Sequence, residues 1–409
     1  MNSQKLYNRY DIGLILLIAS LVVGDFFGAL QPVRLVALIF MPQVLRHFVR
    51  INRFMNKIFL FFLFWLFYII ISLSWTLDLS QGLKEILYYI SHFSLFLLIQ
   101  DWAYRAINPL RSIIGGWLLF FLLTCPIAFY ELIYDVHLPL SIQSSDMVVN
   151  LGDGFVLQKK FASVSFGSYN TYVTHLCFAM PFSFSFLLLK KNILFQCIGW
   201  ASIMMMAYIL LMNASRGGIL CLVVVLFCLL YYYRQVAFKS KWIILFFVLF
   251  VTIILIIPNW NVITEQFVAR FVGKTNIFED SARSNLISTA WNLFLESYAV
   301  GTGVGSIIAA MSTKTSGVII PHNLFLELLV QYGLIIFIFC FCFIIRLFFN
   351  VFFSERRKTI NGFILVSSFC SLPFVSVINS GYLLMPALWI YFSCLTFLSF
   401  SKRSKSILN

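Results

Sequence analysis

The chain has 409 residues, of which 61% are hydrophobic and only 11% are charged, and its mean hydropathy is +0.94. A soluble domain could not bury so much apolar side chain, so the composition predicts an integral membrane protein. The net charge of +14 does not indicate nucleic-acid binding, because the basic residues form no single stripe. All nine cysteines lie in apolar segments without metal-ligand spacing, and we interpret them as small buried hydrophobes.

Apolar runs recur along the chain at the length that a helix needs to cross about 30 Å of hydrocarbon. They predict an all-α, polytopic membrane protein with about twelve transmembrane helices in a single integral membrane domain, residues 1–409. The first run lacks a cleavage pattern and is expected to be a retained span. The second is the weakest, because Pro42 would also fit a re-entrant segment. The expected spans are 12–30, 33–49, 57–75, 84–100, 112–130, 168–189, 192–212, 217–234, 241–257, 323–348, 360–378 and 382–400.

The distribution of Lys and Arg predicts the orientation, because retained positive charge marks the cytoplasmic side of a membrane. With the N-terminus inside, most of the 29 Lys and Arg fall in inner loops, and both termini lie in the cytoplasm. The outer face then holds two sizeable loops, 132–167 and 258–321. The larger one joins the ninth and tenth expected helices, and we expect it to contain short helices. This outer face is where chemistry would be housed.

Within the larger loop, the segment 288–298 has apolar residues at helical spacing. It predicts an amphipathic helix that lies along the outer membrane surface. The glycines at 301, 303 and 305 that follow it permit a tight turn. They follow no predicted strand, so we reject a nucleotide-binding loop. The residues expected on the apolar face are Ala290, Leu293, Phe294 and Ser297.

Arginines stand out at two places on the predicted outer face. Arg216, after Ser215, joins two apolar spans with almost no loop, where a guanidinium is costly unless it snorkels or is paired. It is either an interfacial anchor or an anion clamp, since guanidinium is always charged and grips phosphate with two parallel hydrogen bonds. Arg283 is either a solvated loop residue or a second such clamp. Arg270 nearby is a weaker candidate.

His322 stands at a boundary between a polar segment and a long apolar run, between Pro321 and Asn323. A lone histidine is more often structural, but with an ordinary pKa near 6.5 a neutral imidazole can accept a proton near pH 7. Asn323 and Glu327 are four residues apart and share a helix face. Glu327 can equally be the partner of a buried polar group. We interpret the other histidines as structural, without convincing partners: His47, His92, His137 and His175.

A basic, hydroxyl-rich segment leads into the sixth expected span and suits sugars and phosphates. Lys160 and Asn170 are its candidate contacts, and a plain helix cap at Ser168 or Asn170 is the structural interpretation. The outer loops carry no metal signature, so neither a metal nor another cofactor is expected.

Taken in order, these motifs resemble the O-antigen ligase and O-antigen polymerase family. The resemblance covers about residues 161–348. Members of this family transfer a glycan from an undecaprenyl diphosphate carrier at the outer face of the bacterial cytoplasmic membrane, without a nucleotide sugar or a metal. The motifs that carry the resemblance are Ser215–Gly217, Ser281 and Arg283 with Trp291, the glycines of 301–305, Pro321–Asn323 and Gly333.

The resemblance implies roles for individual residues. Arg216 and Arg283 would hold the diphosphate leaving group, and His322 would be the general base on the acceptor hydroxyl. The implied partners are a lipid-linked glycan donor, a glycan acceptor and the bilayer, with a chain-length regulator as a further candidate. The expected substrate-binding residues are Asn323, Ser215, Lys160, Asn170, Arg270 and Glu327.

Three functions fit these observations. The leading one is a polysaccharide polymerase that adds a lipid-linked chain to another lipid-linked repeat unit, because polymerases are the more numerous members. The second is an O-antigen ligase with a lipid A core acceptor, although Ile336 departs from some ligases. The third is a lipid-linked oligosaccharide flippase. A flippase would predict ionisable residues near mid-bilayer and paired broken helices, which the sequence does not show.

Overall fold

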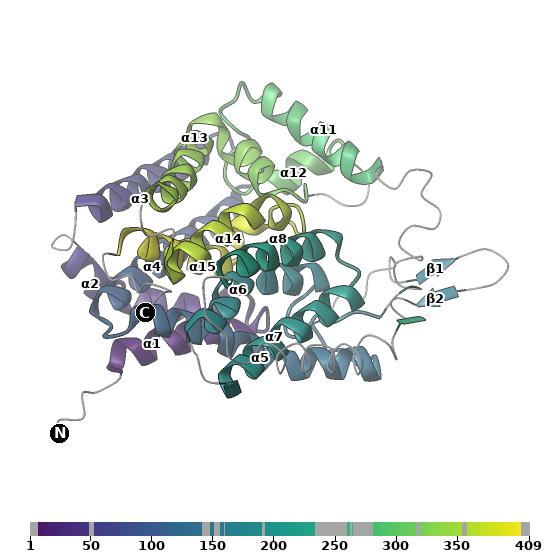
Figure 1. Ribbon diagram of the computed structural model, residues 1–409. Coiled ribbons are helices and arrows are strands. Elements are labelled where there is room, and N and C mark those ends of the chain that lie inside the picture. Colours follow the sequence, from purple (N-terminus) through teal and green to yellow (C-terminus); the bar gives the residue numbers. More distant parts are fainter. Residues whose placement is uncertain are drawn as a thin grey trace.

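The computed structural model of the protein is built almost entirely from helices that pack side by side (Figure 1). It describes residues 7–48, 53–140, 148–150, 156–158, 160–189, 193–233, 260–261, 264, 281–315, 320–353 and 358–401. The helices are α1 (Arg9–Ala19), α2 (Pro32–Phe48), α3 (Arg53–Ser72), α4 (Leu79–Arg105), α5 (Pro109–Tyr134), α6 (Tyr169–Leu189), α7 (Ile193–Met212), α8 (Arg216–Tyr233), α11 (Ser281–Glu296), α12 (Ile307–Ser312), α13 (Leu324–Phe352), α14 (Ile360–Val375) and α15 (Pro386–Phe400). Short 3₁₀ turns are η1 (Ser20–Val23), η2 (Gly28–Leu30) and η5 (Tyr382–Leu384).

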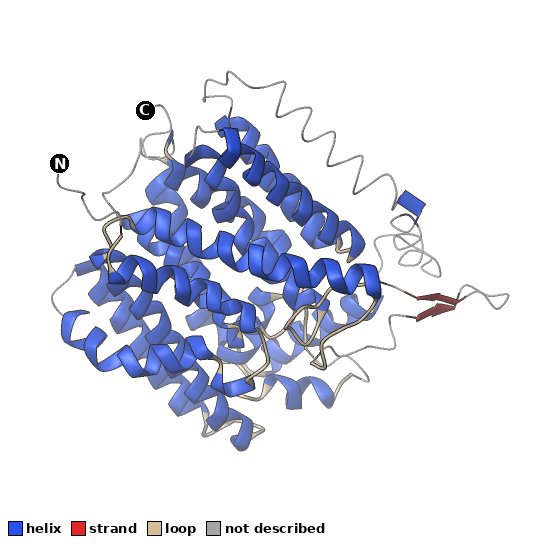
Figure 2. Ribbon diagram, turned by 90° about the horizontal axis from the view of Figure 1, so that it is seen from below, coloured by secondary structure: helices blue, strands red, loops and turns tan. Residues whose placement is uncertain are grey.

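A small hairpin projects from one edge of the helical body (Figure 2). Strands β1 (Val148–Asn150) and β2 (Val156–Gln158) pair in antiparallel fashion, with Val149 opposite Leu157. The hairpin lies in the expected outer loop 132–167, for which no strand was predicted.

Most of the expected spans coincide with a single helix. The first does not: α1 ends at Ala19, and a 3₁₀ turn leads to Gly24, whose φ is +57°. A Cβ at Gly24 would lie 2.3 Å from the carbonyl oxygen of Ser165, so the chain turns here to pack against a distant segment. The prediction of one continuous span over 12–30 was therefore wrong. The weak span 33–49 is a continuous helix, α2, with Pro42 inside it. The expected span 241–257 lies outside the described residues.

Among the described residues, α4, α5, α6 and α13 are long and apolar enough to cross a membrane. Helices α3, α7, α8, α14 and α15 contain shorter apolar stretches. The protein is thus a predominantly helical membrane protein, and the complete set of twelve spans stays a prediction.

At one end of the helical body, hydrogen bonds connect the starts of some helices to the ends of others. The Asn8 amide nitrogen, beside the start of α1, donates to the carbonyl oxygen of Arg105 at the end of α4 (2.8 Å). Asn350 of α13 donates to the carbonyl oxygen of Ser399 in α15 (2.7 Å), and Asn361 of α14 donates to that of Leu398 (3.3 Å). These contacts fit helices that alternate in direction, as the charge distribution predicts. Which end faces the cytoplasm stays a prediction.

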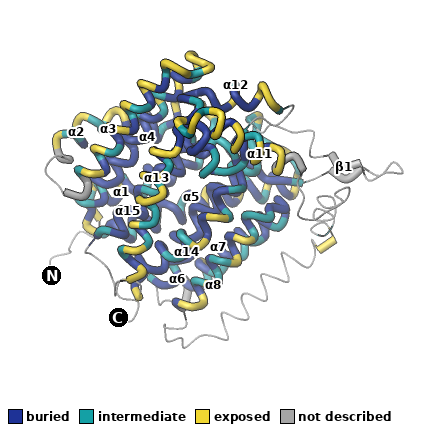
Figure 3. The backbone as a smooth tube through the Cα atoms, turned by 90° about the horizontal axis from the view of Figure 1, so that it is seen from above, coloured by how far each residue is buried: buried dark blue, intermediate teal, exposed yellow. Residues whose placement is uncertain are grey.

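Aromatic side chains form much of the core, and buried residues follow the inward sides of the helices (Figure 3). Trp65 of α3 packs with ring centroids 5.8 Å from Tyr332 of α13 and 5.7 Å from Trp389 of α15. Other large apolar side chains point outward, such as Leu60 and Phe67 of α3, which are 61% and 62% exposed. This outward apolar surface suits a surrounding lipid phase.

Candidate active site

The turn between α7 and α8 places Arg216 at the first residue of α8, half-buried. The Ser215 hydroxyl accepts a hydrogen bond from the Gly218 N–H (3.4 Å), and the Ser215 carbonyl oxygen accepts one from the Ile219 N–H (2.9 Å). Ser215 therefore caps the helix. A Cβ at Gly217 would lie 2.8 Å from Ile378 Cγ1 and 3.2 Å from the Phe374 carbonyl oxygen. Glycine therefore lets the Arg216 turn pack tightly on the end of α14.

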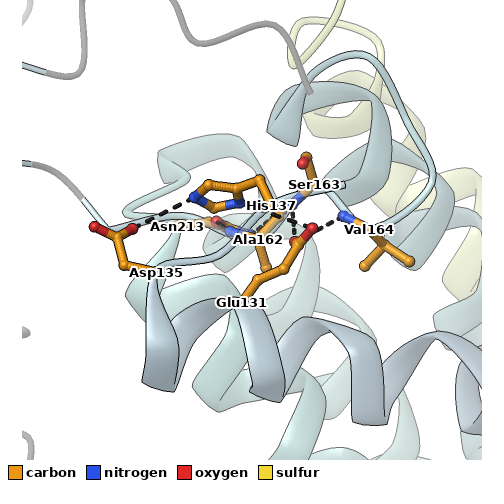
Figure 4. Close-up of polar contacts among 7 residues, drawn as sticks. All are labelled: Glu131, Asp135, His137, Ala162, Ser163, Val164 and Asn213. Carbon is orange, nitrogen blue, oxygen red and sulfur yellow. Dashed lines mark hydrogen bonds and ion pairs between the residues drawn. The ribbon is translucent and has the colours of Figure 1, made fainter. Parts of the chain in front are cut away.

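The segment that follows Lys160 is tied to this turn (Figure 4). Asn213 Oδ1 accepts from the Ala162 N–H (2.7 Å), and Asn213 Nδ2 donates to the Ala162 carbonyl (3.3 Å). Glu131 Oε2 accepts from the N–H groups of Ser163 and Val164, at 2.7 and 2.8 Å. Half-buried Lys160 is thus held on a segment that is bonded to the α7–α8 turn.

His137 is part of the same cluster (Figure 4). Its Nδ1 lies 3.7 Å from Glu131 Oε1, its Nε2 lies 3.4 Å from Asp135 Oδ1, and its ring stacks on Phe161 at 4.0 Å. The structure places two carboxylates beside His137 that the sequence did not predict as its neighbours, while neither ring nitrogen makes a hydrogen bond within the described residues. Its structural role stays a prediction. Two acidic residues just before it in the sequence were the available signal.

Two more histidines also have partners. His92 Nε2 accepts from Arg34 Nε (3.3 Å), and His175 Nδ1 is 2.8 Å from the Thr171 carbonyl oxygen. The prediction that they lack partners was wrong for both. The side chain of His47 lies outside the described part of the chain.

The start of α13 is fixed by its own cap. Asn323 Oδ1 accepts from the N–H groups of Phe325 (2.9 Å) and Leu326 (3.1 Å). Half-buried His322 directly precedes this cap. Asn323 thus orients the backbone that carries His322, and a direct contact of Asn323 with substrate stays a prediction.

Glu327 joins α13 to the loop between α14 and α15. Its Oε1 accepts from the Gly381 N–H (2.7 Å), its Oε2 accepts from the Tyr382 N–H (2.9 Å), and the side chain is 2% exposed. Of its two interpretations, the buried structural partner is the one for which the structure shows contacts. A role for Glu327 in binding substrate stays a prediction.

The end of α14 brings the two predicted catalytic turns together. The Leu324 N–H donates to the Ser376 carbonyl (2.9 Å), next to the Phe374 and Ile378 that face Gly217. The turns of His322 and Arg216 therefore border the same residues, 374–378. The first turn of α6, which carries half-buried Asn170, borders this loop as well, because Asn379 Nδ2 donates to Thr171 Oγ1 (3.1 Å).

The remaining predicted residues lie in or near the large loop. Arg283 belongs to the first turn of α11, but its side chain lies outside the described part, as does all of Arg270. Helix α11 is longer than predicted, and Leu286 is buried with Ala290, Leu293 and Phe294 of the expected apolar face. These residues pack on α12 and α13, so the amphipathic helix is confirmed, and its position on the membrane surface stays a prediction.

The predicted glycine turn is confirmed by positive φ values of +94°, +90° and +74° at Gly301, Gly303 and Gly305. The Gly305 N–H donates to Glu85 Oε2 (3.0 Å), and the Gln331 amide donates to the same oxygen. The turn thus fastens α4 to α13 beside Gly333, whose non-helical φ of 71° kinks α13. Neither Glu85 nor the kink was predicted, because the partners are far apart in the sequence.

Two cavities flank the loop between α14 and α15. The first, which we call the apolar cavity, has a volume of about 390 Å³ and lies between α3, α13 and α15. The second, which we call the polar cavity, has a volume of about 210 Å³ and lies between the α1–α2 connection, α6 and residues 379–386. Within the described residues, no group of three His, Cys, Asp or Glu side chains could hold a metal ion. Metal independence stays a prediction.

Comparison with known proteins identifies the region that carries these turns. Residues 201–341 match the sequence model of the O-antigen ligase family. This part of the chain is similar to the O-antigen ligase family. The family region contains the turns of Arg216 and His322, α11 and the glycine turn, in agreement with the resemblance of their motifs.

The chain is also similar to a curated protein of polysaccharide biosynthesis. The chain is 26% identical over 296 residues to the teichuronic acid biosynthesis protein TuaE of Bacillus subtilis (strain 168). The match covers 68% of this chain and 57% of that protein. The chain thus spans little more than half the length of this relative.

Proposed function

We propose that the protein is a membrane-embedded glycosyltransferase that moves a glycan from a polyprenyl diphosphate carrier to an acceptor hydroxyl at the outer face of the bacterial cytoplasmic membrane. The observation that carries this proposal is the meeting of two turns of the O-antigen ligase region, those of Arg216 and His322, at residues 374–378. One turn supplies a permanent cation and the other an imidazole, which are the groups that such a transfer needs.

In the proposed reaction, the acceptor oxygen attacks the anomeric carbon of the donor. The bond between that carbon and the diphosphate oxygen breaks, and the proton of the acceptor hydroxyl passes to His322. Arg216 and Arg283 stabilise the negative charge that grows on the departing polyprenyl diphosphate. A new glycosidic bond and a free polyprenyl diphosphate are the products, and no redox step is needed.

The apolar cavity supports a lipid-linked donor. Its lining includes Phe61 and Phe62 of α3 and continues along α13 from Leu324 to Arg346. Leu324 follows His322 and Asn323 directly, so this cavity begins beside the proposed reaction centre and runs along most of a membrane-length helix. An apolar groove of this shape suits the polyprenyl chain of the donor.

The acceptor defines two versions of this function. We favour a polymerase, whose acceptor is another lipid-linked repeat unit, and the similarity to a teichuronic acid biosynthesis protein supports a role in polysaccharide synthesis. The alternative is a ligase with a lipid A core acceptor, which the description of the family favours. A chain-length regulator stays a candidate partner of the polymerase.

Complementation tests the proposal. Strains that lack either a polymerase or a ligase, each with its own glycan genes, receive wild type, His322→Ala, Arg216→Ala or the control Lys314→Ala. Lys314 is an exposed cation that pairs with Glu296 and lines neither of the two cavities. We expect long surface chains in the polymerase-null strain with wild type and the control, and none with the other two variants. Rescue of the ligase-null strain alone would show a ligase, and equal rescue by His322→Ala would refute the proposed site.

A further inference from the structure

The polar cavity lies at the end of the body where the turns of Arg216 and His322 meet, and the function proposed above assigns it no role. Three segments that are distant in the sequence enclose it: residues 20–34, the first turns of α6, and residues 379–386. Its polar lining includes Asp25, Gln31, Arg34, His175 and Asn379.

Its charged groups are held in place by the protein. Arg34 is 6% exposed; its guanidinium donates to the carbonyls of Gly28 (3.0 Å) and Leu384 (2.8 Å) and lies 4.4 Å from the Tyr88 ring centroid. Asp25 accepts from the Gly167 N–H (2.9 Å). Groups fixed in this way need little further ordering when a ligand binds.

The net charge of the lining argues for a neutral ligand. Asp25 contributes one negative charge and Arg34 one positive charge, while His175 is four per cent exposed and bonded to a neutral carbonyl. A phosphate or a metal cation would place an uncompensated charge among partly buried groups, which is costly. A ligand without net charge would leave the balance between Asp25 and Arg34 intact.

Hydrogen-bond acceptors dominate the rest of the lining. The His175 Nδ1 donates to a carbonyl oxygen, which leaves Nε2 as the acceptor of the neutral ring. Buried Gln31 Oε1 accepts from no protein group in the part of the chain that the structure describes, and Asp25 adds carboxylate oxygens. Such a lining calls for a ligand that donates several hydrogen bonds while also accepting from Arg34 or Ser380, as the hydroxyl groups of a sugar do.

The position of the cavity connects it to glycan transfer. Ser380 and Gly381 are part of its wall, and the Gly381 N–H is bonded to Glu327 of α13, about one helical turn from His322. At about 210 Å³, the cavity is smaller than the roughly 300–1,000 Å³ of typical ligand pockets, so it suits a single ring. We propose that the polar cavity binds one neutral sugar residue of the glycan that the protein transfers. The role of this sugar in transfer depends on the proposed function, whereas its binding does not.

The test uses the purified full chain in a detergent without a sugar headgroup. Glucose, galactose and N-acetylglucosamine are each added alone, and inorganic phosphate is added in a separate arm, with binding followed by saturation-transfer NMR and calorimetry. Ser380→Trp fills the half-buried wall of the cavity, and Ser74→Trp, on an exposed serine after α3, is the matched control. We expect at least one sugar to bind to wild type and to the control, and not to Ser380→Trp.

A second variant keeps the proposal falsifiable if Ser380→Trp does not fold. Asp25→Asn keeps an acceptor for the Gly167 N–H but removes the charge that balances Arg34. Sugar affinity should then fall about tenfold, the usual loss for a hydrogen bond to a charged group, and phosphate should begin to bind. Sugar binding that Asp25→Asn leaves unchanged would overturn the proposal, as would phosphate binding to wild type in this cavity or no sugar binding at all.

Transfer assays separate this proposal from the proposed function. His322→Ala should abolish transfer but leave sugar binding intact, because His322 does not line the polar cavity. Ser380→Trp should reduce both. If Ser380→Trp lost sugar binding but kept full transfer activity, the bound sugar would not belong to the transferred glycan but to another molecule, such as a membrane glycolipid. That result would overturn the proposal.

Discussion

The apolar cavity and the polar cavity lie on two sides of the same stretch of chain, residues 379–389. Leu383, Leu388 and Trp389 line the apolar cavity, whereas Leu384, Met385 and Pro386 line the polar one. A lipid chain and a sugar ring would need opposite surroundings, and the loop before α15 together with the first turn of α15 borders both cavities. We call residues 376–385 the dividing loop, and both proposed binding sites border it.

Buried contacts fix the dividing loop. Glu327 accepts from the N–H groups of Gly381 and Tyr382. The Tyr382 hydroxyl donates to the Val375 carbonyl and accepts from the N–H of Asn379 (2.9 Å). Residues at the base of the loop, within its support and in one of the two cavities should therefore respond differently to substitution.

The largest effect is expected at the base of the loop. Arg216 lies beside residues 374–378 and lines neither cavity, so its loss should impair the reaction and leave binding within the two cavities unchanged. Arg216→Ala should lower kcat by about 10²–10³-fold, the effect of removing one group that stabilises transition-state charge. Arg216→Lys should recover part of the lost kcat, since lysine keeps the positive charge but cannot make two parallel hydrogen bonds to phosphate. A change in KM alone would contradict this account.

A smaller effect is expected when the support of the loop is altered. In Glu327→Gln, one of the two backbone N–H groups would face the amide NH₂ and lose its acceptor. The free energy of unfolding should fall by about 1–3 kcal/mol, measured as a lower temperature of unfolding in detergent. Asn350→Ala, which removes a contact at the opposite end of the body, is the control. Binding in both cavities should weaken in Glu327→Gln only, and an effect on one cavity alone would refute the shared wall.

The smallest effect is expected from a substitution that fills only the apolar cavity. Leu328 lines the apolar cavity and is absent from the lining of the polar one. Leu328→Trp should raise the KM for the lipid-linked donor about tenfold while kcat stays unchanged. This pattern is expected when a variant loses an interaction that is equally strong in the ground state and the transition state. Leu328→Met, of similar volume, is the matched control. Unchanged kinetics in Leu328→Trp would show that the donor chain lies elsewhere.

The sequence was sufficient for features set by composition and local spacing. Apolar runs predicted α4, α5, α6 and α13, because a membrane span must be apolar wherever it packs. His322 was found because a polar residue at the start of a long apolar run is conspicuous. The neighbours of His137 were within reach too, since Asp135 and Glu131 precede it by only two and six residues.

Tertiary contacts account for what was missed. The break after α1 depends on Gly24 meeting Ser165, and the hydrogen bond from Arg34 to Leu384 spans 350 residues of sequence. The sequence around Arg34 looks like that around any arginine in a helix near a membrane boundary. Only the packing of α2 against α4 and the dividing loop shows that it is buried beside a cavity.

The most direct test of the central claim is reconstitution of the full chain in vesicles that contain an undecaprenyl-diphosphate-linked repeat unit of known sugar composition. Wild type should convert the repeat unit into a ladder of longer chains and release undecaprenyl diphosphate. His322→Ala should slow this by about 10²–10⁴-fold, the contribution of a general base, while it still binds the donor. Chain growth by His322→Ala at the rate of wild type would contradict the account.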